Sequence, residues 1–436
     1  MTKYFNNIFW RWHFYAGLFI TPLLITLSIS GILYLFYPQV EQVVNHDALF
    51  GQTGKPKQSL DAGLHDIEMK YPGWHVMKVS FPKAHYNTRI TLMGPDDGSK
   101  VIYLDHHNHI QAALNPAQLF SNITREFHSH LLTGNTIVNY MVELAACWTL
   151  FLIATGLFMT FYKKYLTQPK SKIDRKNKAK FHALLGTVFA LPLTLLILSG
   201  LPWSGYLGDK IYSFAVDHTV IGFPEAEKIA PVSNNEIPWA TRNEHTNSTA
   251  AHSARLPLSR VVQLAEEESF HRPYSISVPM DDRGTYVLSV NSATGVTGLD
   301  ASPFDERTIH LDQYSGMKLA IFDFADYGIL AKLIAISIPL HEGQLFGVIN
   351  QLINLLVTSA LLVIAGYGIN IYLMRKVRGS LSSPRAQRYN RYSWIFAALL
   401  LIMGILMPLF GLSVLVIAVI EIILLLVRRK KKQLTI

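Results

Sequence analysis

RWHFYAGLFITPLLITLSISG, residues Arg11 to Gly31, decides the fold of this chain, because a second stretch repeats its pattern. That stretch, Lys180 to Gly200, reads KFHALLGTVFALPLTLLILSG. Each copy has a basic and an aromatic residue before a histidine, a glycine four residues after it, and Ser-Gly at seventeen and eighteen. A histidine at the edge of a lipid-spanning helix needs a partner. Two such helices predict one ligand held between two imidazoles.

The composition is typical of a membrane protein. Of the 436 residues, 50% are hydrophobic and 16% are charged. A span needs about 20 apolar residues, and five stretches are long enough, at residues 8–37, 137–162, 181–203, 345–374 and 394–427. The last stretch is longer than one span needs, and Met407-Pro408 lies in its middle. We predict a hairpin there and six spans in total; one long tilted helix, giving five spans, is the alternative.

Basic residues set the predicted orientation. They cluster at residues 163–180, 375–391 and 428–432, and by the positive-inside rule these segments face the cytoplasm. The long polar stretch 205–339 has 17 acids and 10 bases and is expected outside. The net charge of +9 is therefore a topology signal and does not indicate nucleic-acid binding. We predict an inner membrane protein with both termini cytoplasmic and two large periplasmic domains.

The predicted architecture alternates spans with polar segments. The segments are 1–37 (N-terminus and first span), 38–134 (first external domain), 135–162 (second span), 163–180 (basic loop), 181–204 (third span), 205–344 (second external domain), 345–374 (fourth span), 375–392 (basic loop), 393–427 (hairpin) and 428–436 (tail). The fold class is a helical polytopic membrane protein with two external α+β domains and an internal duplication of span, domain and span.

The duplication continues ahead of the second and fourth spans. His128 precedes Gly134 by six residues, and His341 precedes Gly347 by six. Each external piece also reads as a helix followed by strands. The predicted helices are 59–70 and 258–267, and the predicted strands are 75–81, 88–93, 100–104, 274–278, 285–290 and 308–311. The lone Cys147 excludes an intrachain disulfide and an iron–sulfur cluster built from this chain alone.

The order of these motifs resembles the PepSY-associated transmembrane family, over about residues 5 to 380. That family includes iron-regulated membrane proteins and inner-membrane ferrisiderophore reductases that carry b-type haem. The resemblance implies external PepSY-like domains and two haem b groups. It also implies that the helix-end histidines are axial ligands of haem iron, which carries over to His13, His182, His128 and His341.

Helical geometry agrees with a flat cofactor. Gly17 and Gly186 each lie four residues beyond a histidine, on the same helical face, where a missing Cβ lets a plate approach. Gly31 and Gly200 lie eighteen residues beyond, which is five turns and about 27 Å along the helix. We infer an inner site on His13 and His182. An outer site would use His128 and His341, with His130 as the alternative to His128.

Other polar residues leave alternatives open. The run Asp105-His106-His107-Asn108-His109 is either a metal site or an exposed turn. Glu342, beside His341, either orients an imidazole or is a solvated neighbour. Glu143 and Glu421 lie in predicted spans, where a carboxylate is a functional candidate such as a quinol proton acceptor, although both also fit a membrane interface.

These features predict an inner-membrane di-haem oxidoreductase that passes electrons outward and reduces a ferric chelate, as a ferrisiderophore reductase does. Two histidine ligands leave no open iron position, which suits electron transfer. The cytoplasmic segments are too short for a flavin or nicotinamide domain, so a membrane quinol or a separate cytoplasmic flavin reductase would donate electrons. A PepSY-type regulatory module and an iron or siderophore transporter are the alternatives.

Overall fold

The structure is a computed structural model, and it describes residues 2–95, 98–224, 248, 254–377, 384 and 392–433. The chain divides into two compact units. The helical unit comprises residues 1–32, 128–211 and 353–436, and the sheet unit comprises residues 33–127 and 212–352. Each unit is described by itself.

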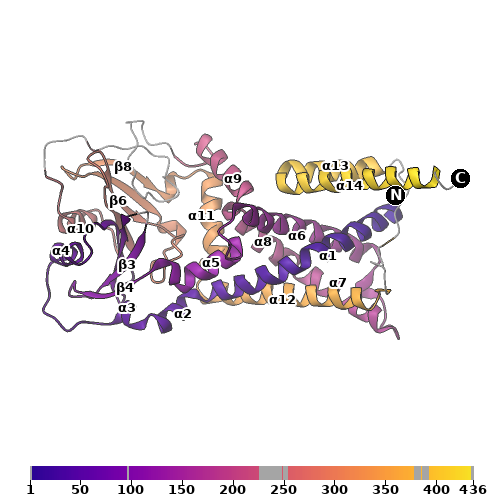
Figure 1. Ribbon diagram of the computed structural model, residues 1–436, viewed down its shortest axis with the longest axis horizontal. Helices are drawn as coiled ribbons and strands as arrows, with labels where there is room; N and C mark the ends of the chain where they lie inside the picture. Colours follow the sequence, from indigo (N-terminus) through magenta and orange to yellow (C-terminus); the bar gives the residue numbers. More distant parts are fainter. Residues whose placement is uncertain are drawn as a thin grey trace. The chain divides into compact units, whose positions relative to one another are not determined.

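Apolar helices build the helical unit (Figure 1). They are α1 (Thr2–Leu35), α6 (Thr136–Tyr162), α7 (Asp174–Val188), α8 (Ala190–Gly200), α12 (Val348–Leu373), α13 (Ser393–Leu406) and α14 (Pro408–Gln433). In the described part of the chain, α1, α6 and α12 are each long and apolar enough to cross a membrane. The bent pair of α7 with α8 makes up to four. The protein is therefore a membrane protein with several candidate spans, as the sequence predicted.

The C-terminal apolar region folds into two helices rather than one. The α13 helix ends before Met407, and Pro408 begins α14. A Cβ added at Gly404 would meet Gly411 Cα at 2.9 Å, so the two backbones touch at these glycines. The α13 helix has 14 residues, fewer than the roughly 20 that a bilayer needs. Six spans, with five as the alternative, therefore stay a prediction.

Aromatic side chains form the core of the helical unit. Trp148 of α6 stacks on Trp12 of α1, with ring centroids 6.1 Å apart, and lies 4.6 Å from the ring of Phe410. Its indole N–H donates to Ser413 Oγ at 3.1 Å. Because rings from three helices meet here, this cluster anchors α14 to α1 and α6. Cys147 is fully buried beside it, as a packing residue would be.

The sheet unit has one antiparallel sheet of eight strands, in the order β4-β3-β2-β1-β5-β6-β7-β8. The strands are β1 (His75–Phe81), β2 (Thr88–Met93), β3 (Ser99–Leu104), β4 (Ile110–Leu114), β5 (Tyr274–Ser277), β6 (Thr285–Val290), β7 (Arg307–Asp312) and β8 (Lys318–Asp323). The six strands predicted from the sequence are present, and β4 and β8 are additional. The two predicted external pieces join where β1 pairs with β5, with Val79 opposite Ile276.

Two amphipathic helices complete the core of the sheet unit. Helices α4 (Leu60–Lys70) and α10 (Leu258–Glu267) were both predicted and both contribute to one hydrophobic cluster. Ile67 of α4 and Val261 of α10 pack in that cluster with Val79 and Ile276 of the two central strands. Each half of the unit is thus one helix followed by four strands. Duplication of the whole chain stays a prediction.

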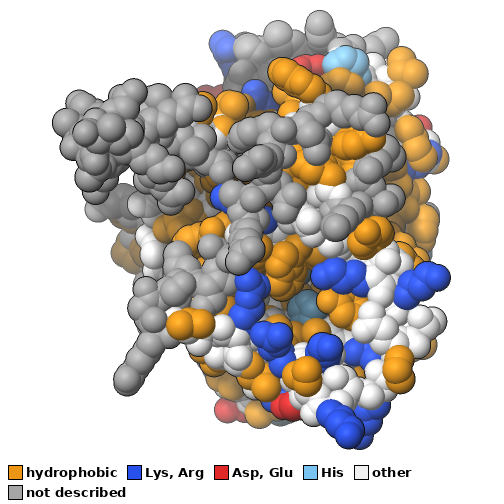
Figure 2. All heavy atoms as spheres, turned by 90° about the vertical axis from the view of Figure 1, so that its right-hand side faces the viewer, with side chains coloured by type: hydrophobic (Ala, Val, Ile, Leu, Met, Phe, Trp, Pro, Cys, Tyr) orange, Lys and Arg blue, Asp and Glu red, His pale blue; other side chains and the backbone are white. Residues whose placement is uncertain are grey.

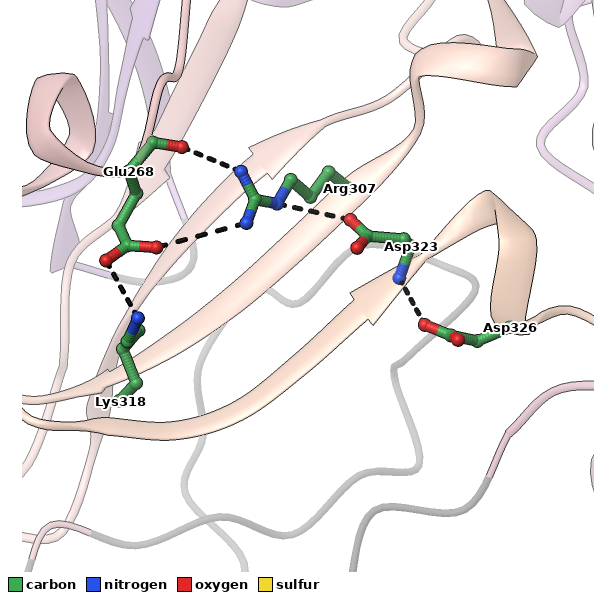
Figure 3. A network of polar contacts seen from close by, with 5 residues as sticks. All are labelled: Glu268, Arg307, Lys318, Asp323 and Asp326. Carbon is green, nitrogen blue, oxygen red and sulfur yellow. Dashed lines mark hydrogen bonds and ion pairs between the residues drawn. The ribbon is translucent and has the colours of Figure 1, made fainter.

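Shorter helices connect these elements. They are α2 (Tyr37–Val44), α3 (His46–Phe50), α5 (Phe120–His130), α9 (Tyr206–Asp217) and α11 (Ile329–His341). At the edge of the sheet, charged side chains cover β8 (Figure 3). Arg307 Nε lies 3.1 Å from Asp323, and Lys318 Nζ lies 2.9 Å from Glu268. Charges on an edge strand oppose pairing with another chain.

Candidate functional site

His13 and His182 lie together in the helical unit. His13 lies in the fourth turn of α1, and His182 lies in the middle of α7. Their ring centroids are 6.4 Å apart, and the two ring planes are nearly perpendicular at 89°. Residues 169 positions apart in the sequence thus present two imidazoles to each other at one level of the bundle.

The hydrogen bond of His13 fixes which ring nitrogen carries its proton. His13 Nδ1 lies 3.0 Å from Thr155 Oγ1 on α6. That hydroxyl already donates its proton to the Phe151 carbonyl at 2.8 Å. The imidazole must therefore donate from Nδ1, because a hydroxyl has one proton. Nε2 is left with a lone pair, the form in which histidine binds a metal.

His182 has the same tautomer for a simpler reason. Its Nδ1 lies 3.0 Å from the Ile364 carbonyl oxygen on α12. A carbonyl can only accept, so Nδ1 carries the proton and Nε2 keeps its lone pair. Metal-ligating histidines usually donate their other N–H to a carbonyl, carboxylate or water, which fixes the ring orientation. Both imidazoles are therefore oriented as metal ligands are.

Glycines provide space beside the pair and close contact behind it. A Cβ added at Gly17 or Gly186 would meet nothing within 4 Å. Behind the rings, a Cβ at Gly156 of α6 would meet His13 Cε1 at 3.3 Å, and one at Gly368 of α12 would meet His182 Cε1 at 3.7 Å. The rings thus rest on bare backbone, while the glycines one turn further along face open space.

This geometry fits a metal that sits inside a planar ligand. A metal about 2 Å from each of two facing imidazole nitrogens would separate the ring centroids by roughly 6 Å, and the observed separation is 6.4 Å. Two histidines are half of the four ligands that a structural zinc site needs. A porphyrin supplies four nitrogens of its own, and its iron can take up to two further ligands from the protein. The donor set and the open space at Gly17 and Gly186 therefore suit haem.

His128 follows the same pattern at the far end of α1. Its Nδ1 lies 3.0 Å from Ser30 Oγ, and that hydroxyl donates to the Leu27 carbonyl at 3.1 Å. Nδ1 is again the donor and Nε2 keeps its lone pair. A Cβ at Gly31 would meet His128 Cε1 at 3.3 Å. His130 instead places Nδ1 2.7 Å from the hydroxyl of its neighbour Ser129, so His128 has the ligand-like environment.

His341 belongs to the sheet unit and is the last residue of α11. Its local structure matches that of His128, which lies in the last turn of α5. A glycine with positive φ follows each short helix, Gly134 at 62° and Gly347 at 58°, and a spanning helix begins directly afterwards. The repeated His-x5-Gly motif thus ends one helix and lets the chain turn into the next.

Glu342 is half-buried, and its Oε2 is shielded from solvent. Tyr34 donates its hydroxyl proton to Glu342 Oε1 at 2.8 Å. Burial raises the pKa of Glu342 to about 7, against the opposing effects of the Tyr34 hydrogen bond and the Arg125 charge. The solvated-neighbour reading of Glu342 is therefore wrong, because desolvation dominates its environment.

The run from Asp105 to His109 forms a turn between β3 and β4. Asp105 Oδ1 accepts the backbone N–H groups of His107 and His109, each at 2.9 Å. His107 Nδ1 lies 2.6 Å from the Lys55 carbonyl, and His109 Nε2 lies 2.7 Å from the Pro56 carbonyl. No three His, Cys, Asp or Glu side chains gather into a metal-sized group among the described residues. These contacts describe a hydrogen-bonded turn that includes His106.

The two carboxylates in predicted spans differ in what the structure shows. Glu143 of α6 is buried, and its Oε2 accepts the backbone N–H groups of Tyr206 and Leu207 at 2.8 and 2.9 Å. It therefore caps the first turn of α9, where backbone donors lack helical partners. The side chain of Glu421 lies outside the described residues. Gly200 ends α8.

Sequence reasoning missed the residues that orient the histidines. They are Thr155 and Gly156 on α6, Gly368 and the Ile364 carbonyl on α12, and Ser30 on α1. The repeated Ser-Gly was noticed for its glycine only, although its serine bonds His128. Thr155 and Gly156 lie 27 and 28 residues after His128, and Gly368 lies 27 residues after His341. This shared spacing of small residues could have identified them.

Comparison of the sequence with models of known protein families identifies the family. Residues 10–375 match the PepSY-associated TM region, which is most of the 436-residue chain. The chain therefore belongs to the PepSY-associated TM region family, and the resemblance inferred from the sequence is confirmed. Among curated proteins, no relative matches this chain.

Proposed function

We propose that the protein is a di-haem b-type oxidoreductase of the bacterial inner membrane that reduces a ferric chelate outside the membrane. The observation that carries the proposal is the His13–His182 pair, with centroids 6.4 Å apart and both Nδ1 atoms bonded to neighbouring helices. Haem at this pair would supply one-electron chemistry through its Fe(III)/Fe(II) couple.

The chain's own residues would bind and orient the cofactor. His13 and His182 would hold one haem, and His128 with His341 would hold the second. Thr155 and the Ile364 carbonyl fix the inner imidazoles, and Ser30 fixes His128. Two histidines at each site would leave no open position on the iron, so the haem would supply electron transfer rather than oxygen chemistry.

The distribution of charge and hydropathy along the sequence supports outward electron transfer. A donor on the basic, cytoplasmic side or in the lipid, either a quinol or a flavin reductase, would give electrons to the inner site. A ferric chelate on the other side would take one electron and become a ferrous chelate. Oxygen-rich chelators are hard ligands and hold Fe(III) better than Fe(II), so reduction releases iron. A ferrisiderophore is the substrate that best matches this chemistry.

The experiment measures haem and its oxidation by substrate. Protein purified in detergent should be red, with Soret and α bands that sharpen on dithionite reduction and two haems per chain. Stopped-flow mixing of the reduced protein with ferric siderophores should restore the oxidised spectrum. The gallium(III) forms of the same siderophores are the control, because Ga(III) is not reduced under these conditions. A colourless preparation, or equal reoxidation with and without the ferric chelate, would contradict the proposal.

A further inference from the structure

Two cations that follow different helices both lie over the indole of Trp10, which is one turn before His13. Lys163 Nζ lies 5.5 Å from the ring centroid of Trp10, and Arg375 Cζ lies 5.4 Å from it. Trp10 is three residues before His13, on the same face of α1. Lys163 directly follows α6, and Arg375 follows α12 by two residues. The ring therefore gathers positive charge from the two helices that also orient His13 and His182.

These two cations differ from their immediate neighbours. Each belongs to a basic pair, Lys163-Lys164 and Arg375-Lys376. The first member of each pair is half-buried and the second is exposed. Arg375 also lies over Phe14, with Cζ 5.6 Å from the ring centroid. The first cation of each pair thus lies over Trp10 and is half-buried, where positive charge is less solvated and attracts an anion more strongly. Lys376 also lies over a ring, with Nζ 6.0 Å from the centroid of Tyr372, but it is exposed.

Negative charge is scarce around them. Residues 163–180 contain eight basic residues and one acid, Asp174. Asp174 pairs with Lys178 at 3.0 Å, and Lys178 also donates to Asn370 Oδ1 at 3.0 Å. Within the described residues, neither Lys163 nor Arg375 has an acidic side chain at ion-pair distance. Figure 2 shows Lys and Arg side chains gathered on one face, with few acidic side chains among them.

We infer that Lys163 and Arg375 bind the two carboxylates of the haem held by His13 and His182. The inference rests on the proposed function, because it needs haem at that pair. Haem carries two propionate groups on one edge, and the structure offers two half-buried cations over Trp10, which lies one turn before the ligand His13. Lysine binds a carboxylate as a point charge, and the planar guanidinium of arginine binds it through two parallel hydrogen bonds.

A comparison of two cofactors tests this directly. The protein is produced without haem, in the His341→Ala background to remove the outer site, and is titrated in detergent with haem or with haem dimethyl ester. The ester keeps the iron and the ring but removes both negative charges. Binding is followed by the Soret band of the bis-histidine complex, so the readout is affinity and not activity. The parent protein, which keeps Lys163 and Arg375, should have a higher affinity for haem than for the ester. We expect a factor of about 10 for each charged hydrogen bond that haem makes and the ester cannot.

Variants then locate the discrimination. Lys163→Gln and Arg375→Gln should each weaken haem binding by about 10-fold and leave ester binding unchanged. Arg375→Lys should recover part of the loss. Lys164→Gln and Lys376→Gln are the matched controls, since they remove the exposed charges of the same pairs, and they should change neither titration.

Each outcome decides something different. Equal binding of haem and ester by the parent protein overturns the inference even if every variant misfolds. Equal losses in the four Gln variants would mean that the basic face acts through general charge, as in binding anionic lipid headgroups, and would also overturn it. Failure of the parent protein to bind either cofactor would instead refute the proposed function.

Discussion

The two copies of the ligand helix have nearly the same sequence pattern and different shapes. The first copy is the continuous helix α1, which passes through Pro22. The second breaks at Phe189 into α7 and α8, which are bent by 56°. Both copies keep the histidine and its glycine before the proline. What is common to the two copies is therefore the half that carries the ligand.

Each copy contains a proline, and the two helices accommodate it differently. A proline removes one backbone hydrogen bond and its ring collides with the carbonyl four residues earlier. In α1, Pro22 lies in the helix interior, so its missing N–H leaves the Leu18 carbonyl without its usual helical donor. In the second copy, Pro192 lies in the first turn of α8, where an N–H has no helical partner. Because α8 begins just before Pro192, the missing N–H of this proline costs no helical hydrogen bond.

The halves beyond the proline also differ in length, because α1 continues to Leu35 whereas α8 ends at Gly200. In α1 this half leads to Ser30 and Gly31, which contact His128. In the second copy it leads to Gly200 at the end of α8. The comparison teaches that the half carrying the ligand histidine is common to both copies, whereas the backbone beyond it is continuous in α1 and bent between α7 and α8.

The largest predicted effect comes from removing either inner ligand. His13→Ala and His182→Ala should each lower the haem content from two to one per chain, because a bis-histidine site needs both rings. Pyridine haemochrome assay of the purified variants measures this. His46→Ala, at an exposed histidine, is the control and should keep both haems. Full haem content in either variant would show that the histidine of that copy is not a haem ligand, which would contradict the claim that both copies contribute one ligand.

The next effect comes from filling the open space one turn beyond each histidine. Gly17→Leu and Gly186→Leu should lower haem affinity by about 10- to 100-fold, as overpacking of a filled site costs about 1–3 kcal/mol. Gly17→Ala and Gly186→Ala serve as size controls and should have smaller effects. Haem titration of each variant measures the series. If the Leu variants bind haem as the parent does, the space at these glycines does not belong to the cofactor.

A smaller effect should come from Thr155, the residue that orients His13. Thr155→Val removes the hydroxyl and should weaken haem binding by about 10-fold, the lower end of what such partners contribute. Thr155→Ser keeps the hydroxyl and should behave like the parent. The equivalent contact of His182 is to a backbone carbonyl, so no substitution can remove it. Equal affinities for the Val and Ser variants would show that this hydrogen bond does not position the ligand.

The smallest effects should come from the prolines themselves. Pro22→Ala restores a backbone N–H in the interior of α1 and should raise the thermal unfolding temperature. Pro192→Ala should raise it less, because the first turn of α8 has no partner for that N–H. Neither should change the haem spectrum, since both histidines precede the prolines. Loss of haem in Pro192→Ala would show that the bend itself shapes the ligand half.

Much of the fold could be predicted from the sequence. Period-two alternation identified six of the eight strands, and helices α4 and α10 were found from their amphipathic pattern. The strands β4 and β8 were missed because Ile110–Leu114 is short and Lys318–Asp323 begins with a lysine and ends with an aspartate. The joining of both halves into one sheet depends on the pairing of β1 with β5, a long-range contact that local pattern does not encode.

The candidate site could be predicted in part. The repeat predicted that His13 and His182 face each other, and the structure places them so. The residues that fix their tautomers were not found, because Thr155 and Ile364 lie on other helices and look like ordinary spanning residues in the sequence. The repeat also could not show the break at Phe189, since Pro22 and Pro192 occupy nearly the same place in the two copies.

The most direct test of the central claim is low-temperature electron paramagnetic resonance of the oxidised protein. Two nearly perpendicular imidazoles on one iron predict a strongly anisotropic low-spin ferric signal from the inner haem. His182→Ala should abolish that signal and give a high-spin signal or no inner haem at all. A low-spin signal that is unchanged in both His13→Ala and His182→Ala would contradict the account.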